Sequence, residues 1–193
     1  MDLGRLFLRG VVGPLFVGHG TQKLFGWFDG HGLEGTGGFF ESLGLRPGKR
    51  HASAAGAAET AGGVLLTLGA FTPVATTIIT GTMVTAIRKV HLDKGPWASA
   101  GGYEYNLALI AALASLAETG PGSPSVDDAL LPGFRGTGWA LAAMAAGAAG
   151  SYLATERFNE PAPAPAPQAA DAELQRQPRF AREQAEAAVD GPA

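Results

Sequence analysis

The sequence contains no cysteine. Without thiols, the chain offers no disulfide, thiolate nucleophile, iron–sulfur ligand or dithiol redox relay. It also has no basic stripe, and its formal net charge at pH 7 is −3. Because nucleic-acid binding needs a positively charged surface, we expect no nucleic acid among the partners of this chain.

Charge is scarce in the body of the chain. Residues 1–155 carry ten Lys/Arg and ten Asp/Glu, whereas residues 156–193 carry four Arg and seven Asp/Glu, which accounts for the net charge. The mean hydropathy is only +0.12. Much of the apolar content is Ala, and the 29 Gly add little hydropathy, so this average understates the apolar segments.

Five apolar segments are predicted to be helices. They lie at about residues 3–25, 52–70, 73–90, 104–117 and 138–154. The first has roughly 22 residues, enough for a hydrocarbon core of ~30 Å. Some stretches are apolar all round rather than striped, which favours lipid over water as their surroundings. We therefore expect an all-α integral membrane helical bundle, with a soluble Ala/Gly-rich bundle as the alternative.

The expected organisation has three regions. Residues 1–128 would form a membrane domain of four transmembrane helices. Residues 129–155 would add a loop and a fifth transmembrane helix, which is Ala-rich. Residues 156–193, with the run Pro-Ala-Pro-Ala-Pro-Ala-Pro, would form a disordered, charged tail.

The ends of the first segment carry polar residues. Arg5 and Arg9 lie near its start and are expected to extend towards lipid headgroups. At its other end, His19, Gln22 and Lys23 are spaced by three and four residues, which places them on one face of a helix. Such residues at the end of a hydrophobic span usually face inward and serve a function.

A short helix is expected after the first segment. Phe39, Phe40 and Leu43 fit one face of a helix lying in the membrane interface. His31 and His51, in the same polar stretch, are expected to face solvent. Further along the chain, residues 120–136 are expected to form a polar loop.

Antiparallel ordering of the segments brings five ionisable residues towards one membrane face. These residues are His19, Lys23, Glu59, His91 and Glu104. With Gln22 and Asn106 they define a candidate polar pocket, in which Glu59 or Glu104 would pair with Lys23. His19 or His91 would then give or take a proton, because imidazole titrates near neutral pH.

Three other interpretations of these residues stay open. In the first, the charged side chains only pair with one another and hold the helices together, since buried charges are seldom left unpaired. His19 and His91 would be axial ligands of a haem, or would bind a metal with a carboxylate. Nothing else in the sequence supports either group, so we predict no metal and no evident cofactor, with a quinone as the candidate ligand.

Five ordered blocks of the sequence resemble the DoxX family. They are Gly18-His-Gly-Thr-Gln-Lys-Leu-Phe-Gly-Trp-Phe28, Gly37-Gly-Phe-Phe-Glu-Ser-Leu-Gly44, Glu59-Thr-Ala-Gly-Gly-Val-Leu-Leu66, Val90-His91 and Gly101-Gly-Tyr-Glu-Tyr-Asn106. The similarity covers about residues 3–128. It implies a four-helix integral membrane bundle in the plasma (inner) membrane. This chain departs from that plan by its fifth segment and its Pro-Ala tail.

The resemblance also implies a link to redox chemistry. The family takes its name from a small subunit linked to archaeal quinone-dependent oxidase and thiosulfate oxidation complexes, and relatives are linked to membrane complexes that handle oxidative and thiol stress. The expected partners are the lipid bilayer and membrane or soluble redox proteins. We expect an accessory subunit of a quinone-linked or oxidative-stress system. The alternatives are a small-molecule or quinone-binding protein that uses the polar pocket, and a scaffold that recruits soluble enzymes.

Overall fold

The structure, a computed structural model, describes residues 2–162. Met1–Glu160 form one compact unit of the chain. All regular structure within the described residues is helical. This confirms the expected all-α class.

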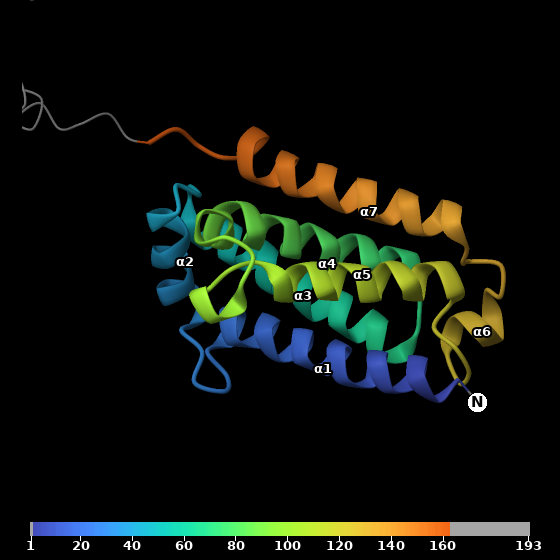
Figure 1. Cartoon of the computed structure of the whole chain (residues 1–193). Helices are drawn as coiled ribbons and strands as arrows, with labels where there is room; N and C mark the ends of the chain where they lie inside the picture. Colours follow the sequence, from blue (N-terminus) through green and yellow to red (C-terminus); the bar gives the residue numbers. More distant parts are fainter. Residues whose placement is uncertain (1, 163–193) are drawn as a thin grey trace, which may run out of the picture. The chain divides into compact units, whose positions relative to one another are not determined.

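Five long helices form the bundle shown in Figure 1. They are α1 (Leu3–Phe25), α3 (Gly48–Leu68), α4 (Thr72–Ala86), α5 (Glu104–Thr119) and α7 (Thr137–Tyr152). Each corresponds to one of the five apolar segments. The expected short helix is present as α2 (Gly32–Ser42), and the expected loop 120–136 contains a further short helix, α6 (Val126–Leu130).

The first two long helices pack against each other through glycine. Gly13 lies against Gly63, and Gly20 lies against Gly56, so the chains run antiparallel along a glycine seam. A Cβ added at Gly20 would lie 2.5 Å from the carbonyl oxygen of Gly56, far inside contact distance. Small residues therefore allow these two backbones to approach as closely as they do.

The core of the bundle joins α1, α3, α4 and α5. Its buried side chains are Phe16, Leu66, Ala75, Ile79, Met83, Leu109, Leu113 and Leu116. On the other side of α4, α7 packs closely, with Gly147 against Thr80 and a 2.8 Å hydrogen bond between the hydroxyls of Thr85 and Ser151. The helix α7 thus covers α4 and α5 on the side away from α1 (Figure 1).

Two buried charges hold the end of the bundle where α1 begins. Arg9 is only 4% exposed and donates hydrogen bonds to the carbonyl oxygens of Thr67 and Pro124. The expectation that Arg9 extends towards headgroups is therefore wrong, because these orphan carbonyls bind its guanidinium. Asp127 of α6 accepts from the N–H groups of Phe71 and Thr72 at 2.6 and 2.7 Å, which caps the start of α4.

The first residues of the expected tail are held against the bundle. The side chain of Asn159 accepts a hydrogen bond from the N–H of Arg46 and donates to the carbonyl of Gly44 at 2.8 Å. The N–H of Glu160 donates to Arg46 O at 2.9 Å. The expected disorder of the tail covers residues 156–193, of which residues 163–193 lie outside the described residues.

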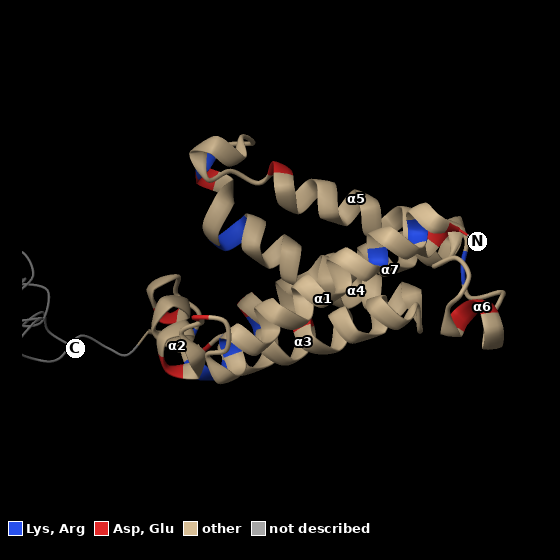
Figure 2. Ribbon diagram, turned by 90° about the horizontal axis from the view of Figure 1, so that it is seen from below, with Lys and Arg blue, Asp and Glu red and all other residues tan. Residues whose placement is uncertain are grey.

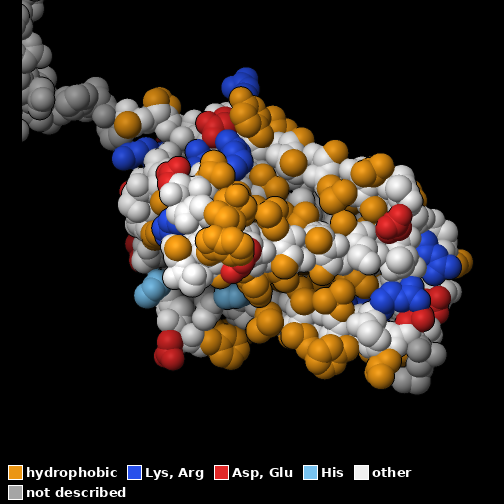
Figure 3. Space-filling model, in the orientation of Figure 1, with side chains coloured by type: hydrophobic (Ala, Val, Ile, Leu, Met, Phe, Trp, Pro, Cys, Tyr) orange, Lys and Arg blue, Asp and Glu red, His pale blue; other side chains and the backbone are white. Residues whose placement is uncertain are grey.

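Large apolar side chains are exposed on the outer face of α1. Leu3, Phe7, Val11 and Leu15, spaced by four residues, are 68%, 71%, 42% and 52% exposed. On the face drawn in Figure 3, hydrophobic side chains cover the middle of the bundle and charged ones gather towards its two ends. Among the helices of residues 2–162, none combines the length and the hydropathy of a candidate membrane span. The transmembrane arrangement therefore stays a prediction.

Candidate functional site

A cavity of ≈ 810 Å³ opens at the end of the bundle where α1 finishes and α3 begins. Figure 2 shows the elements around it, seen from below. Its walls are mostly apolar and come from α1, α3, α4, α5 and α7, with α2 contributing Phe39 and Phe40. The polar or charged residues that line it include His19, Lys23, His51, Glu59, Lys89, His91 and Asn106.

The ion pair at this cavity joins α1 to α3. The Nζ atom of Lys23 lies 2.6 Å from Oε2 of Glu59, and the two side chains are 23% and 8% exposed. Nζ also donates to the carbonyl oxygen of His19 at 3.3 Å. Of the two carboxylates considered from the sequence, Glu59 is the one that pairs with Lys23. The glycine seam positions the pair, because Gly20 and Gly56 bring the two backbones together one turn away.

The second carboxylate, Glu104, does not line the cavity. Its Oε1 accepts a hydrogen bond from the N–H of Ala98 at 2.8 Å, within the loop that leads into α5. Its expected place in the polar pocket is therefore wrong, because this local backbone donor binds the carboxylate. The neighbouring Asn106 does line the cavity, is 6% exposed, and donates from Nδ2 towards Sδ of Met83 at 3.4 Å.

The two histidines named in the sequence both line the cavity. His19, at the exposed end of α1, has Nδ1 3.2 Å from Oε1 of Gln22. Gln22 does not line the cavity, and its Nε2 donates to the carbonyl oxygen of Phe28 at 3.1 Å. His91 closes a π-helical turn, Ile87–His91, that continues α4, and its Nδ1 lies 2.7 Å from the carbonyl oxygen of Gly101.

Two polar residues of the cavity were missed from the sequence. His51, expected to face solvent, is half-buried and lines the cavity, with Nε2 3.2 Å from Arg46 O. Lys89 also lines it and donates to Glu156 at 3.1 Å. The pair Arg88-Lys89 next to His91 was visible in the sequence, but its partner lies 67 residues further along the chain.

Glu156 forms ion pairs with two cations of the turn that continues α4, Arg88 and Lys89. Arg88 donates to the same Oε1 atom at 2.8 Å, and its guanidinium lies over the ring of Tyr152. The hydrogen bond from Lys89, with the charges of both cations, lowers the pKa of Glu156 below its ordinary value. These contacts attach the end of α7 to α4 beside the cavity.

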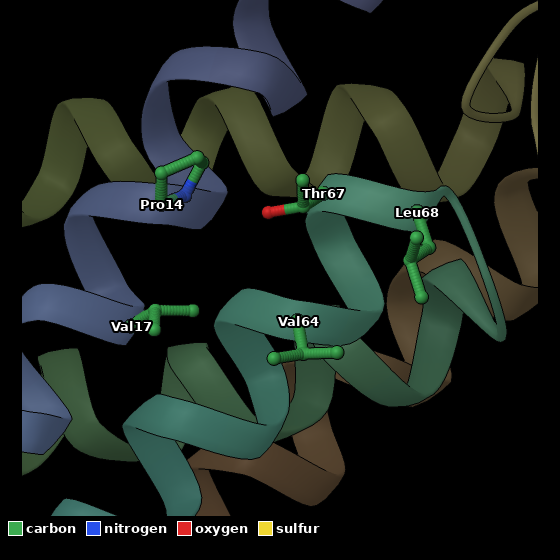
Figure 4. Close-up of a pocket in the computed structure, with 5 residues that line it drawn as sticks. All are labelled: Pro14, Val17, Val64, Thr67 and Leu68. Atoms are coloured by element: carbon green, nitrogen blue, oxygen red, sulfur yellow. The ribbon is translucent and has the colours of Figure 1, made fainter.

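A second, smaller hollow lies between α1 and α3, as Figure 4 shows. Its volume is ≈ 260 Å³, and its lining residues are Pro14, Val17, Val64, Thr67 and Leu68. The hydroxyl of Thr67 is already bonded to the carbonyl of Gly63 at 2.8 Å. With no titratable side chain in its wall, this hollow offers no chemistry beyond apolar contact.

No three His, Asp or Glu side chains of residues 2–162 lie close enough together to hold a metal ion. A mononuclear site with three or four protein ligands has no support in this part of the chain. The polar residues of the cavity instead present hydrogen-bonding groups and one ion pair beside apolar walls. This arrangement can bind and orient a molecule that has a polar head and an apolar body.

Comparison with known proteins agrees with the first four of the five blocks seen in the sequence, and the block at residues 101–106 lies outside the match. Residues 4–92, from α1 to the end of the π-helical turn, match the family model described as DoxX. Helices α5 and α7 lie beyond the matched residues. Neither a curated protein nor a solved structure matches the chain. The α1 to α4 region, which supplies His19, Lys23, Glu59 and His91, is therefore a DoxX region.

Proposed function

We propose that this chain crosses the membrane several times and binds a small amphipathic molecule of the quinone class in its cavity, as an accessory subunit of a quinone-linked redox system. The observation that carries the proposal is the cavity itself. Five helices supply its apolar walls, and the Lys23–Glu59 pair and the rings of His19 and His91 supply polar groups beside them. A ring with polar oxygens and an apolar tail matches this distribution of groups.

The exposed apolar surface supports the membrane arrangement. The stripe from Leu3 to Leu15 on α1 would be costly in water but favourable against lipid chains. Trp97 and Tyr105 near the cavity end, and Trp139 near the other, are residue types enriched at membrane interfaces. The excess of Lys and Arg at the cavity end favours a cytoplasmic position for that end, with the N-terminus outside.

Membrane insertion is tested by fractionation. After lysis and ultracentrifugation without detergent, the protein should stay in the pellet through high-salt and carbonate washes. Protein recovered in the supernatant would contradict the membrane arrangement.

Binding in the cavity is tested with a short-chain quinone. Purified full-length protein in nanodiscs should bind decylubiquinone with saturable stoichiometry in a calorimetric titration. Ala58→Phe places a ring in the cavity wall and should abolish binding, whereas Ala57→Phe, which is exposed on the same helix and outside the wall, should not. Equal affinities for the two variants would refute binding at this site.

The accessory role rests on what the chain can and cannot supply. It has no thiol for redox relays, and its cavity offers acids, bases and hydrogen-bonding groups. Electrons would then pass through a partner protein. Affinity capture from solubilised membranes should recover a redox subunit with the full chain. A chain ended after Ala162 distinguishes recruitment by the tail, the scaffold alternative, from contact with the helices.

The alternative, in which the polar residues only stabilise the bundle, makes a different prediction. A Lys23→Met/Glu59→Gln double variant removes both charges and leaves neither unpaired, so the fold should survive. If the cavity binds a ligand through this pair, quinone affinity should fall in this folded variant. Unchanged affinity would assign the pair to stability alone.

A further inference from the structure

The side-chain amide of Gln22 can be oriented in only one way. Its outer atom lies 3.1 Å from the carbonyl oxygen of Phe28, which only accepts hydrogen bonds, so that atom is the NH₂ group. The amide oxygen therefore faces Nδ1 of His19 at 3.2 Å. Since an amide oxygen also only accepts, Nδ1 of His19 carries the proton. In the neutral ring, Nε2 of His19 is then a hydrogen-bond acceptor.

The same reasoning applies to the other histidines of the cavity. Nδ1 of His91 lies 2.7 Å from the carbonyl oxygen of Gly101, so it donates and leaves Nε2 as the acceptor. Nε2 of His51 faces the carbonyl oxygen of Arg46 at 3.2 Å, which leaves Nδ1 of His51 as the acceptor. In each ring, a hydrogen bond from one nitrogen to a backbone or side-chain oxygen fixes the tautomer.

Both ammonium groups of the cavity already donate to protein acceptors. The ammonium of Lys23 donates to Glu59 and to the carbonyl of His19. The ammonium of Lys89 donates to Glu156. Within the described residues, neither Nε2 of His19 nor Nε2 of His91 has a protein hydrogen-bond partner. These two histidine rings, when neutral, therefore offer a ligand a hydrogen-bond acceptor rather than a donor.

We infer that the cavity selects the reduced, hydroxyl-bearing form of its ligand, a hydroquinone, over the oxidised quinone. Quinone oxygens only accept hydrogen bonds, and they would meet imidazole lone pairs. The hydroxyls of a hydroquinone donate, and a hydroxyl can satisfy such a lone pair. The inference rests on the proposed function, because it specifies which redox form of that ligand class binds.

Gln22 acts as a positioning residue in this arrangement. It does not line the cavity, yet it determines which nitrogen of His19 presents a lone pair there. A methionine at position 22 keeps the length of the side chain but replaces the amide oxygen with a sulfur that accepts hydrogen bonds only weakly. In Gln22→Met, His19 should populate both tautomers, which ¹⁵N NMR of labelled imidazoles distinguishes by the shifts of Nδ1 and Nε2. A purely structural role of Gln22 would leave these shifts unchanged.

The test compares three probes on the full-length protein in nanodiscs under argon: decylubiquinone, decylubiquinol and the dimethyl ether of decylubiquinol. The ether has the shape of the quinol but no hydroxyl donor. We expect the quinol to bind about tenfold more tightly than either other probe, since one well-placed hydrogen bond contributes up to about that factor. The preference should fall in Gln22→Met and in His91→Phe. It should persist in His31→Phe, because His31 lies outside the cavity wall.

The outcomes separate the inference from the proposed function. Equal binding of all three probes, or tighter binding of the quinone, would overturn the selectivity for hydroxyl donors and leave cavity binding intact. A preference for the quinol that His91→Phe does not reduce would place the donor contact elsewhere and also overturn the inference. If none of the probes binds, the proposed function fails and the selectivity fails with it.

Discussion

Alanine substitutions along α1 should change stability in opposite directions according to which face they occupy. Gly13 and Gly20 lie in the seam with α3, whereas a Cβ at Gly10 or Gly18 would meet nothing within 4 Å. On the open face, Ala should stabilise the helix by up to about 1 kcal/mol, because Gly is the poorer helix former. In the seam, the same substitution should destabilise the protein.

The structure sets the size of the seam effect. The Cβ at position 20 would lie 2.5 Å from the carbonyl oxygen of Gly56 and 2.6 Å from the N–H nitrogen of Thr60. To reach an ordinary contact of 3.4 Å, the two backbones must separate by about 0.9 Å at this point. Overpacking of this kind costs about 1–3 kcal/mol. Because the gain in helix propensity is common to all four variants, the difference between seam and open positions isolates that cost.

The measurement is reversible unfolding of the four variants in mixed detergent micelles. Gly20→Ala and Gly13→Ala should unfold at lower denaturant than the wild type, and Gly10→Ala and Gly18→Ala at equal or higher denaturant. Gly20→Ala should also weaken the Lys23–Glu59 pair, which lies one turn away across the same interface. If all four variants were equally stable, the close approach of α1 and α3 would be wrong.

Three further predictions concern the charged groups. Lys23→Met or Glu59→Gln alone should destabilise the protein by about 3 kcal/mol, because each leaves a buried or half-buried charge unpaired. The double variant should lose less stability than the sum of the two single losses. Additive losses in a double-mutant cycle would contradict an interaction between Lys23 and Glu59. Asp127→Asn keeps one of the two acceptors that hold the start of α4 and should cost about 1.5–3 kcal/mol in the same unfolding assay, whereas an unchanged midpoint would exclude this cap. The lowered pKa of Glu156 means that its contact with Lys89 is complete above the ordinary value of 4.5 and is lost as the pH falls through the lower value. A ¹³C titration of the Glu156 carboxyl should therefore have its midpoint below 4.5 and move upwards in Lys89→Met, and a midpoint that does not respond would contradict the contact.

The positions of the helices could be predicted from the sequence because they depend on local pattern. The apolar segment at residues 3–25 coincides with α1, and only residues 69–71 connect α3 to α4. Antiparallel order also follows from such short connections. It was enough to bring His19, Lys23, Glu59 and His91 to one end of the bundle, as the cavity shows.

The partners of individual polar side chains depended on the tertiary structure. Whether Lys23 pairs with Glu59 or Glu104 is decided by the glycine seam, which brings α1 and α3 together, and by a loop N–H that engages Glu104. Arg9 is buried because the carbonyls of two distant segments converge on it, and helix periodicity carries no information about that convergence. Local sequence thus determined where each long helix runs, while contacts between residues far apart in the chain decided which polar groups face the cavity and which are already satisfied.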